Sequence, residues 1–169
     1  LAKDLRGIHL GHGSTFGFGG PENDLAGWDF SGQDLTDAWF NGANLTNTDL
    51  TGAVVNGVNF EGASLHGFTK EQLYSTASYR THDLRGIDFQ VNNLSGWDLS
   101  GQDLINALFR EAKLTNADLT GADARGAQLL DVSRAVSRNA ILPDGSIAGF
   151  ELAAHERMLV RDDDGVPGS

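Results

Sequence analysis

Cysteine is absent from this sequence of 169 residues, and proline, positive charge and long apolar runs are scarce. Without cysteine the chain has no disulfide, no thiolate metal ligand and no cysteine nucleophile. No apolar run approaches the roughly eighteen residues that a transmembrane helix needs, so no membrane span is predicted. Lysine and arginine number 12 against 23 aspartates and glutamates, which gives a formal net charge of −11. A chain this acidic repels phosphate backbones, which argues against direct nucleic-acid binding.

Glycine, by contrast, is abundant. The chain has 22 glycines and only 3 prolines, a balance that predicts many tight turns. Hydrophobic residues make up 40%, which favours a folded domain over a disordered tail. The sequence starts at Leu1 and shows no signal peptide, so we expect a fragment or a mature form.

Apolar residues recur at every fifth position. The first series is Leu25, Phe30, Leu35, Phe40, Leu45, Leu50, Val55, Phe60 and Leu65. The second is Tyr79, Leu84, Phe89, Leu94, Leu99, Leu104, Phe109, Leu114, Leu119, Ala124 and Leu129. If the apolar residue is position i, alanine is frequent at i−2, aspartate at i−1 and glycine at i+2.

Neither a helix nor a flat strand can bury a period of five. On a helix, each step of five turns the apolar side chain by about 140°, and on a strand it alternates faces. A turn in every unit resolves this, because four units then close a square coil of 20 residues with the i and i−2 side chains inside. The coil predicts stacked sets of core residues: Leu25/Leu45/Leu65, Phe40/Phe60, Leu84/Leu104/Ala124 and Phe89/Phe109.

Several units resemble the pentapeptide repeat family: A-N-L-T-N at 43–47, T-D-L-T-G at 48–52, A-S-L-H-G at 63–67 and A-D-L-T-G at 117–121. The resemblance implies an all-β fold, a solenoid known as the right-handed quadrilateral β-helix. We expect it over 1–134, followed by C-terminal capping strands and an acidic tail over 135–169. The family includes exported proteins and DNA-mimicking gyrase inhibitors, so the resemblance leaves the function open.

The β-helix is expected to contain two homologous blocks, about 3–65 and 77–131. Lys3–Ile8 recurs as His82–Ile87, and Gly27–Leu35 recurs as Gly96–Leu104. The first block carries an insertion at 11–22, in which five of twelve residues are glycine. We interpret it as a loop off one corner, and the alternative is a binding loop that uses Phe16 and Phe18.

A second insertion lies at 67–76. Thr69 and Gln72 form a capping-box pattern, which predicts a short helix that begins at Lys70, near 70–75. We expect a helical bulge outside the coil, packed down by Phe68 and Leu73. The stretch F-T-K-E-Q-L-Y-S-T-A-S-Y resembles a spacer in exported bacterial members of the family.

Two of the three tryptophans occupy a position of the repeat that is unusual for a large side chain. Trp28 and Trp97 occupy i−2, a slot that is usually small. Either the coil widens there, with the amides of Gln33 and Gln102 satisfied by backbone groups, or a small-ligand pocket is repeated.

Trp39, at i−1, should point outward, as should Val54 and Leu108. Together with Phe16 and Phe18 they are a candidate interaction surface for a partner or a homodimer, and isolated surface side chains are the alternative.

The period ends after Leu129. The stretch 140–152 is typical of strand, Pro-Asp-Gly turn and strand, and 157–161 of a third strand, which together would cap the coil. Asp162–Gly165 lacks the ligand spacing of an EF-hand loop, so we interpret it as an acidic tail and not as a calcium site.

The sequence indicates no catalytic site, cofactor or metal. His9 and His12 lie three residues apart, but without a metal-binding motif. The aspartates at i−1 are expected to support turns by accepting backbone hydrogen bonds. They also form a candidate acidic stripe, because a period of 20 aligns them: Asp29, Asp49, Asp83, Asp103, Asp123, Asp98 and Asp118.

The expected function is a non-enzymatic structural or interaction scaffold, secreted or at the cell surface, with a protein or glycan partner. The alternative is a cytoplasmic acidic DNA mimic that inhibits a DNA-binding enzyme such as DNA gyrase.

Overall fold

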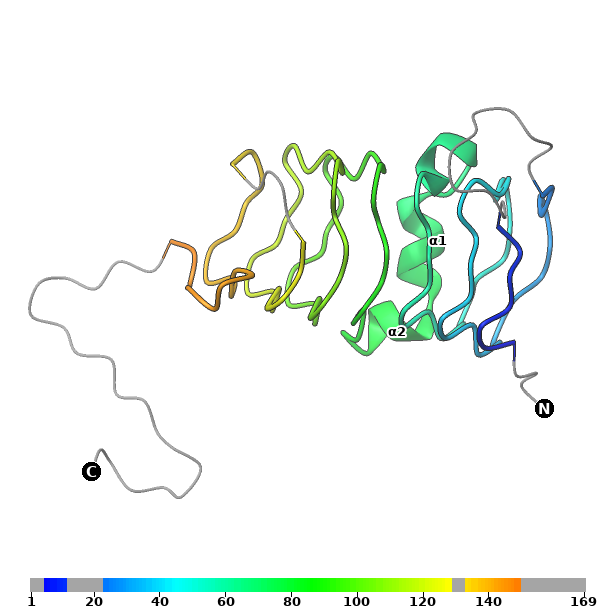
Figure 1. The fold of residues 1–169 in the computed structure, drawn as a ribbon, viewed down its shortest axis with the longest axis horizontal. Coiled ribbons are helices and arrows are strands. Elements are labelled where there is room, and N and C mark those ends of the chain that lie inside the picture. The colour runs from blue at the N-terminus through cyan, green and yellow to red at the C-terminus, as the bar shows by residue number, and fades with distance from the viewer. Residues whose placement is uncertain (1–4, 12–22, 129–132, 150–169) are drawn as a thin grey trace, which may run out of the picture.

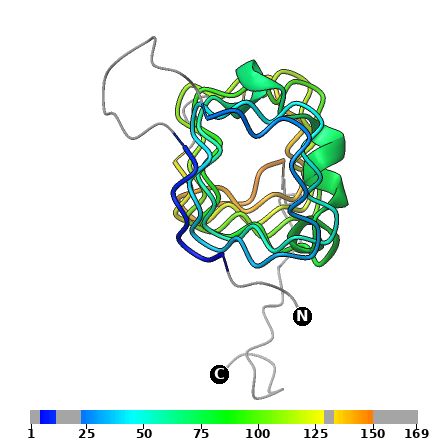
Figure 2. The same cartoon turned by 90° about the vertical axis from the view of Figure 1, so that its right-hand side faces the viewer.

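The chain winds into a four-sided coil, as a view along its length shows (Figures 1 and 2). The structure, a computed structural model, describes residues 5–11, 23–128 and 133–149. Parallel bridges join residues 20 apart, such as Asp29 with Asp49 and Asp83 with Asp103. The predicted coil of 20 residues is therefore confirmed for these rungs.

The bridges define four faces, which we name by a feature of each. The asparagine face contains Asp24, Asn44, Asn93 and Lys113. The α1 face contains Asp29, Asp49, Asp98, Asp118 and Val136. The arginine face contains Asp34, Val54, Asp83, Asp103, Asp123 and Ile141. The tryptophan face contains His9, Trp39, Asn59, Asp88, Leu108 and Gln128.

Every unit turns a corner through one short hydrogen bond. The N–H of Ala38 donates to the carbonyl of Leu35 at 2.8 Å, and that of Ala43 donates to Phe40 at 3.0 Å. The third residue of such a turn has positive φ, for example 67° at Gly42. Glycine adopts this conformation without the steric cost that a Cβ brings, which explains its abundance at i+2.

Pairing between coils is limited to single residues. Within the described part of the chain, β structure occurs only as isolated bridges, because a turn follows every bridge residue after a few positions. The expected all-β character therefore takes the form of stacked bridges instead of extended strands.

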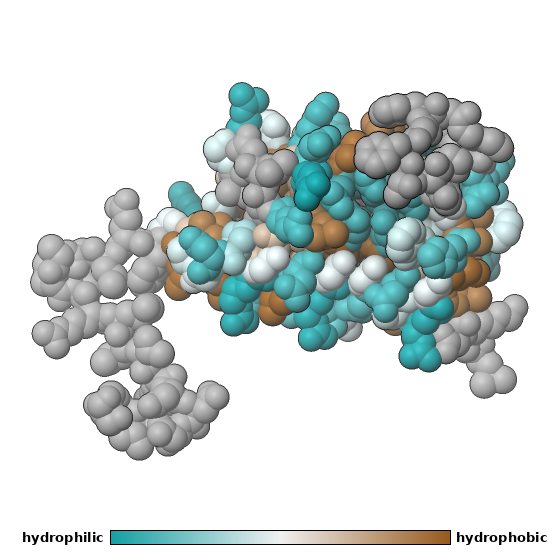
Figure 3. All heavy atoms as spheres, viewed as in Figure 1, coloured by the Kyte–Doolittle hydropathy of each residue, from teal (hydrophilic) through white to brown (hydrophobic). Residues whose placement is uncertain are grey.

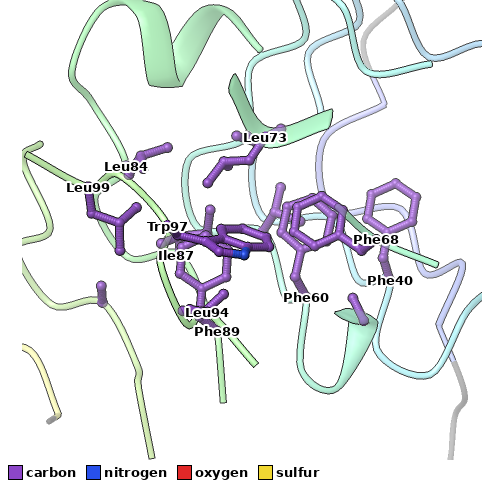
Figure 4. Packing of buried hydrophobic residues seen from close by; sticks show 14 of the residues in the cluster. Phe40, Phe60, Phe68, Leu73, Leu84, Ile87, Phe89, Leu94, Trp97 and Leu99 are labelled. Carbon is purple, nitrogen blue, oxygen red and sulfur yellow. The ribbon is translucent and has the colours of Figure 1, made fainter. Parts of the chain in front are cut away.

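The core is a column of apolar side chains inside the coil (Figure 4). Most of the i residues are fully or almost fully buried, and the small i−2 residues fit beside them. Four phenylalanines stack behind the tryptophan face: Phe40, Phe60, Phe89 and Phe109. The predicted pairs Phe40/Phe60 and Phe89/Phe109 are confirmed, each with ring centroids 5.7 Å apart.

Three short helices interrupt the coil between its two blocks. They are the 3₁₀-helix η1 (Ala63–His66), α1 (Lys70–Ser75) and α2 (Ala77–Arg80). The predicted start of α1 and its Thr69–Gln72 capping box are confirmed. Phe68 and Leu73 are buried, as expected.

The expectation that this helix bulges outside the coil is wrong. The carbonyl of Ser75 accepts from Gly52 N–H at 2.8 Å, and the Gln72 amide donates to the carbonyls of Leu45 and Thr48. On the other side, Tyr74 and Tyr79 bind Asp98. Helix α1 therefore forms part of the wall of the α1 face, between the two sets of coils (Figure 1).

Two residues of the periodic series do not take the predicted core position. Leu65 lies in η1 and is 67% exposed, because the chain leaves the coil after Gly62. The Leu45 N–H donates to the carbonyl of His66, the last residue of η1. Tyr79 lies in α2, half-buried, with its ring stacked on that of Tyr74 at 4.4 Å. The helices lie within the rung that joins Asn59 to Asp88, 29 residues later, so this rung contains nine more residues than the regular rungs of 20.

The predicted strand–turn–strand near residue 140 is present as a small hairpin. Ile141 pairs in parallel with Asp123 and antiparallel with Ile147, and Leu142 N–H donates to the Ser146 carbonyl at 2.7 Å. The expected third strand at 157–161 lies outside the described residues. The hairpin, orange in Figure 2, lies across the opening of the coil.

Candidate interaction surface

The i−1 side chains support the turns, as the sequence predicts. In each case the Oδ1 atom accepts a hydrogen bond from the backbone N–H two residues later. The residues are Asp24, Asp29, Asp34, Asn44, Asp49, Asn59, Asp83, Asp88, Asn93, Asp98, Asp103, Asp118 and Asp123. Asp144, in the Pro-Asp-Gly turn beyond the repeats, accepts the same bond. Asparagine makes the same bond as aspartate, so the turn needs an acceptor and not a charge.

These hydrogen bonds also tune the carboxyl groups. Bonds from the side chain and backbone of Ser31 lower the pKa of Asp29, and bonds from Thr120 lower that of Asp118. Asp88 is different, because burial raises its pKa above the usual value. Desolvation also raises the pKa of Glu61, with a smaller contribution from the charge of Asp88.

The arginine face does not carry an uncompensated acidic stripe. Arg85 pairs with Asp83 at 2.7 Å and with Asp103 at 3.6 Å. Arg125 pairs with Asp123 at 2.6 Å, and hydrogen bonds from these arginines lower the pKa of Asp83 and Asp123. The bridges align the predicted Asp83, Asp103 and Asp123, but two arginines lie beside them.

The α1 face aligns the other predicted aspartates. Asp29 pairs with Asp49, and Asp98 pairs with Asp118. Helix α1 separates the two pairs, so these carboxylates form two short acidic patches along the coil.

The apolar residues of the predicted interaction surface are not brought together. Trp39 and Leu108 share the tryptophan face, but Asn59 and Asp88 lie between them, while Val54 is on the arginine face. Trp39 is 46% exposed, and its ring lies 4.8 Å from that of His9. On the side shown in Figure 3, apolar surface is scattered among polar residues. Phe16 and Phe18, like His12 and the acidic residues 162–164, lie outside the described residues.

The two tryptophans at i−2 have different environments. Trp97 is 6% exposed, in contact with the rings of Phe68, Tyr74 and Phe89, whereas Trp28 is 50% exposed. The coil therefore accommodates Trp97 beside residues 68–79, which contain α1 and most of α2 and which we call the helical segment.

The Gln102 amide is partly satisfied, as one interpretation expected. Its Nε2 lies 3.2 Å from the Tyr79 carbonyl and 3.3 Å from His82 Nδ1, while its buried Oε1 has no hydrogen bond with the described residues. Gln33 Nε2 donates to the Ser31 carbonyl at 3.2 Å.

Sequence reasoning missed the role of Tyr74 and Tyr79. The Tyr74 hydroxyl accepts from the Asp98 N–H at 2.6 Å, and the Tyr79 hydroxyl donates to the Asp98 carbonyl at 2.9 Å. Burial raises the pKa of Tyr79 to about 12. Tyr74 and Tyr79 are five residues apart in the sequence, a spacing that resembles the repeat and hides their origin in two different helices.

Among the described residues, histidine, aspartate and glutamate nowhere form a group of three suited to a metal ion. The helices of this part of the chain are all too short to cross a bilayer.

The sequence matches the family model of the pentapeptide repeats, with eight copies over residues 25–67 and 93–129. The chain is a pentapeptide repeat protein. A search of curated protein sequences finds no match.

Solved structures that the chain matches include QnrB1 and Rfr23. The full-length structure of QnrB1, a plasmid-mediated fluoroquinolone resistance protein, has a TM-score of 0.50 and 15% identity, and covers 89% of this chain and 86% of that chain. Rfr23, a pentapeptide repeat protein of the cyanobacterium Cyanothece 51142, has a TM-score of 0.33 and 19% identity, and covers 85% and 86%. At these identities the likeness to QnrB1 concerns the fold alone.

Proposed function

We propose that this pentapeptide repeat protein is a non-catalytic scaffold, secreted or at the cell surface, whose tryptophan face binds a protein or glycan partner. Its coil is the right-handed quadrilateral β-helix of the family. The observation that supports the proposal is that the i−1 carboxylates accept hydrogen bonds from the backbone of the turns. The many aspartates therefore have a structural role in the coil.

Trp39 is the anchor that this proposal assigns. It is nearly half exposed on a regular, bridge-stacked face, and its ring contacts that of His9. A tryptophan with a fixed orientation supplies a large contact area at little entropic cost, and tryptophan is common among binding hot spots. Both protein surfaces and sugar rings can pack against such a ring.

An array of extracellular proteins and glycans, probed with the purified chain, tests this proposal. We expect a partner whose affinity falls about tenfold or more in Trp39→Ala. Trp28→Ala is the matched control, because Trp28 is equally exposed but lies on another face. Partner binding that is unchanged by Trp39→Ala would refute the assignment of the face. Protease treatment of intact cells that express the tagged full-length gene product tests the location, and a protected protein would contradict it.

An acidic DNA mimic is the second candidate, and it is favoured by the aspartates of the α1 face that form no ion pair with the described residues. Asp29, Asp49, Asp98 and Asp118 carry hydrogen bonds from backbone N–H groups, and no arginine or lysine pair to them is found among the described residues. The arginines beside Asp83, Asp103 and Asp123 weaken the same argument for the arginine face.

Asparagine substitution separates charge from turn support. Asn44, Asn59 and Asn93 make the same turn bond naturally, so Asp49→Asn with Asp98→Asn should keep the fold and remove two charges. A DNA mimic should inhibit gyrase supercoiling in the parent form and lose that inhibition in the double variant. Absence of inhibition by the parent at micromolar concentration would exclude mimicry of gyrase-bound DNA and favour the scaffold.

A further inference from the structure

Trp28 and Trp97 occupy the same place in the two homologous blocks but differ in burial. Gly27–Leu35 recurs as Gly96–Leu104, which aligns the two tryptophans. Trp97 is 6% exposed and Trp28 is 50% exposed. The difference must come from what each block places next to its tryptophan.

Three rings cover Trp97. Its ring centroid lies 5.8 Å from that of Phe68, 6.5 Å from Tyr74 and 6.3 Å from Phe89. The repeat of Lys3–Ile8 as His82–Ile87 aligns Phe89 with Leu10, which packs against the core in the first block. Phe68 and Tyr74 belong to the helical segment, and the described residues contain no equivalent of that segment beside Trp28. The only ring contact of Trp28 within the described residues is with Phe30, at 5.9 Å.

The backbone next to each tryptophan shows the same contrast. Inside the α1 face, each coil pairs with its neighbour: Asp49 N–H donates to the Trp28 carbonyl, and Phe30 N–H donates to the Asp49 carbonyl, both at 2.8 Å. Where α1 replaces a coil, the hydroxyls of Tyr74 and Tyr79 satisfy the N–H and carbonyl of Asp98. The N–H and carbonyl of Asp29 have no hydrogen bond with the described residues. Among the described residues, nothing pairs with this sheet edge, which lies next to the exposed Trp28.

We propose that the Trp28–Asp29 edge is a docking surface for a helical segment of the 68–79 pattern, carried by another block of repeats. Its aromatic residues cover Trp28, its buried leucine closes the end of the core, and its two tyrosine hydroxyls bind the Asp29 N–H and carbonyl. A second copy of this chain cannot provide the segment, because its Leu73 is fully buried in its own wall. Pentapeptide blocks would then join end to end, a mode of assembly separate from partner binding at the tryptophan face.

A fusion that places a copy of residues 68–79 directly before Leu1 tests the proposal. The 79-residue offset between the blocks aligns Leu1 with Arg80, so the fused segment has the register that it has before the second block. Fusion also supplies a high effective concentration, which compensates for the low stability of a short isolated helix. We expect about tenfold slower hydrogen exchange at the Asp29 amide, weaker acrylamide quenching of Trp28 and a higher Tm than the parent chain has.

The control is the same fusion with phenylalanine in place of both tyrosines of the added segment. It keeps the rings and removes the two hydroxyls, so Asp29 exchange should return towards the parent rate while Trp28 stays partly covered. Trp39→Ala in the fused chain should leave the protection at Asp29 intact. Equal exchange at Asp29 in fused and parent chains would overturn the proposal, as would protection that arises only through dimerisation of the parent chain.

Discussion

The ring of Phe60 stacks on that of Phe40, with the centroids 5.7 Å apart and the ring planes 14° apart. Phe60 also contacts Phe68 at 4.4 Å and Phe89 at 6.4 Å. It therefore joins the first coils, the helical segment and the second set of coils in one aromatic column (Figure 4).

Removal of this ring should be among the most damaging single changes. We expect Phe60→Ala to lower the free energy of unfolding by about 3–5 kcal/mol, because the cavity cannot collapse between stacked coils. Phe109→Ala, at the same place two coils further along, should cost a similar amount. Leu65→Ala is the control, since Leu65 is largely exposed, and it should change stability by less than about 0.5 kcal/mol. Urea unfolding measures all three, and equal midpoints for the parent and both phenylalanine variants would contradict the stacked core.

Gln72 should contribute more to the stability of the fold than its role in the cap of α1 accounts for. Thr69 and Gln72 cap α1 reciprocally, so Thr69→Ala should cost about 1 kcal/mol. The Gln72 amide also donates to the carbonyls of Leu45 and Thr48, both at 2.8 Å, and its loss leaves these wall groups unpaired. We therefore expect Gln72→Ala to cost about 1–3 kcal/mol more than Thr69→Ala in thermal unfolding. A smaller cost for Gln72→Ala would mean that α1 is held to the wall by packing alone.

Substitution of Gly67 and of Gly27 by alanine separates the strain of a positive φ from the steric clash of an added Cβ. Both have positive φ, 88° and 69°, so alanine is strained at each by about 1–2 kcal/mol. A Cβ at Gly27 meets nothing within 4 Å, whereas at Gly67 it would lie 2.8 Å from the backbone nitrogen of Thr46. Gly67→Ala should therefore cost about 1–3 kcal/mol beyond Gly27→Ala, because the chain must move where it enters the helical segment. Chemical denaturation of both variants tests this, and equal losses would show that the segment can shift freely.

The regular coil could be predicted from the sequence, but the places where the chain departs from the coil could not. The period of five fixes which residues face inward, and the Thr69–Gln72 pattern fixes where α1 begins, because both depend on local chemistry. Leu65 keeps the period but is exposed, because the chain enters η1 there, while Phe68, which is outside the period, is buried. The position of α1 in the wall depends on hydrogen bonds from Gln72 and Tyr74 to distant coils, for which the sequence has no local signal.

The candidate surface shows the same division. The turn-supporting role of the aspartates could be predicted, because it is confined to neighbours in the sequence. The pairing of Arg85 with Asp103 crosses from one coil to the next, and the position of Leu108 on the same face as Trp39 depends on the additional nine residues between Asn59 and Asp88. The difference between Trp28 and Trp97 depends on which block has a helical segment beside it, which no single repeat unit contains.

The pH dependence of stability should have opposite signs at Asp118 and Asp88. Hydrogen bonds from Thr120 lower the pKa of Asp118 in the folded chain, so its stabilising effect is complete above the unfolded pKa of about 4 and is lost as the pH falls through the folded value. Burial raises the pKa of Asp88, so its stabilising effect is present below the unfolded pKa and is lost as the pH rises through the folded value. Asparagine can keep both turn bonds while it removes the titration. We therefore expect Asp118→Asn to be less stable than the parent at pH 7 with a difference that vanishes in acid, and Asp88→Asn to gain relative to the parent as the pH rises. Thermal melts between about pH 2.5 and 7 measure both trends. Parallel pH profiles for the parent and the two variants would show that neither carboxyl group is coupled to folding.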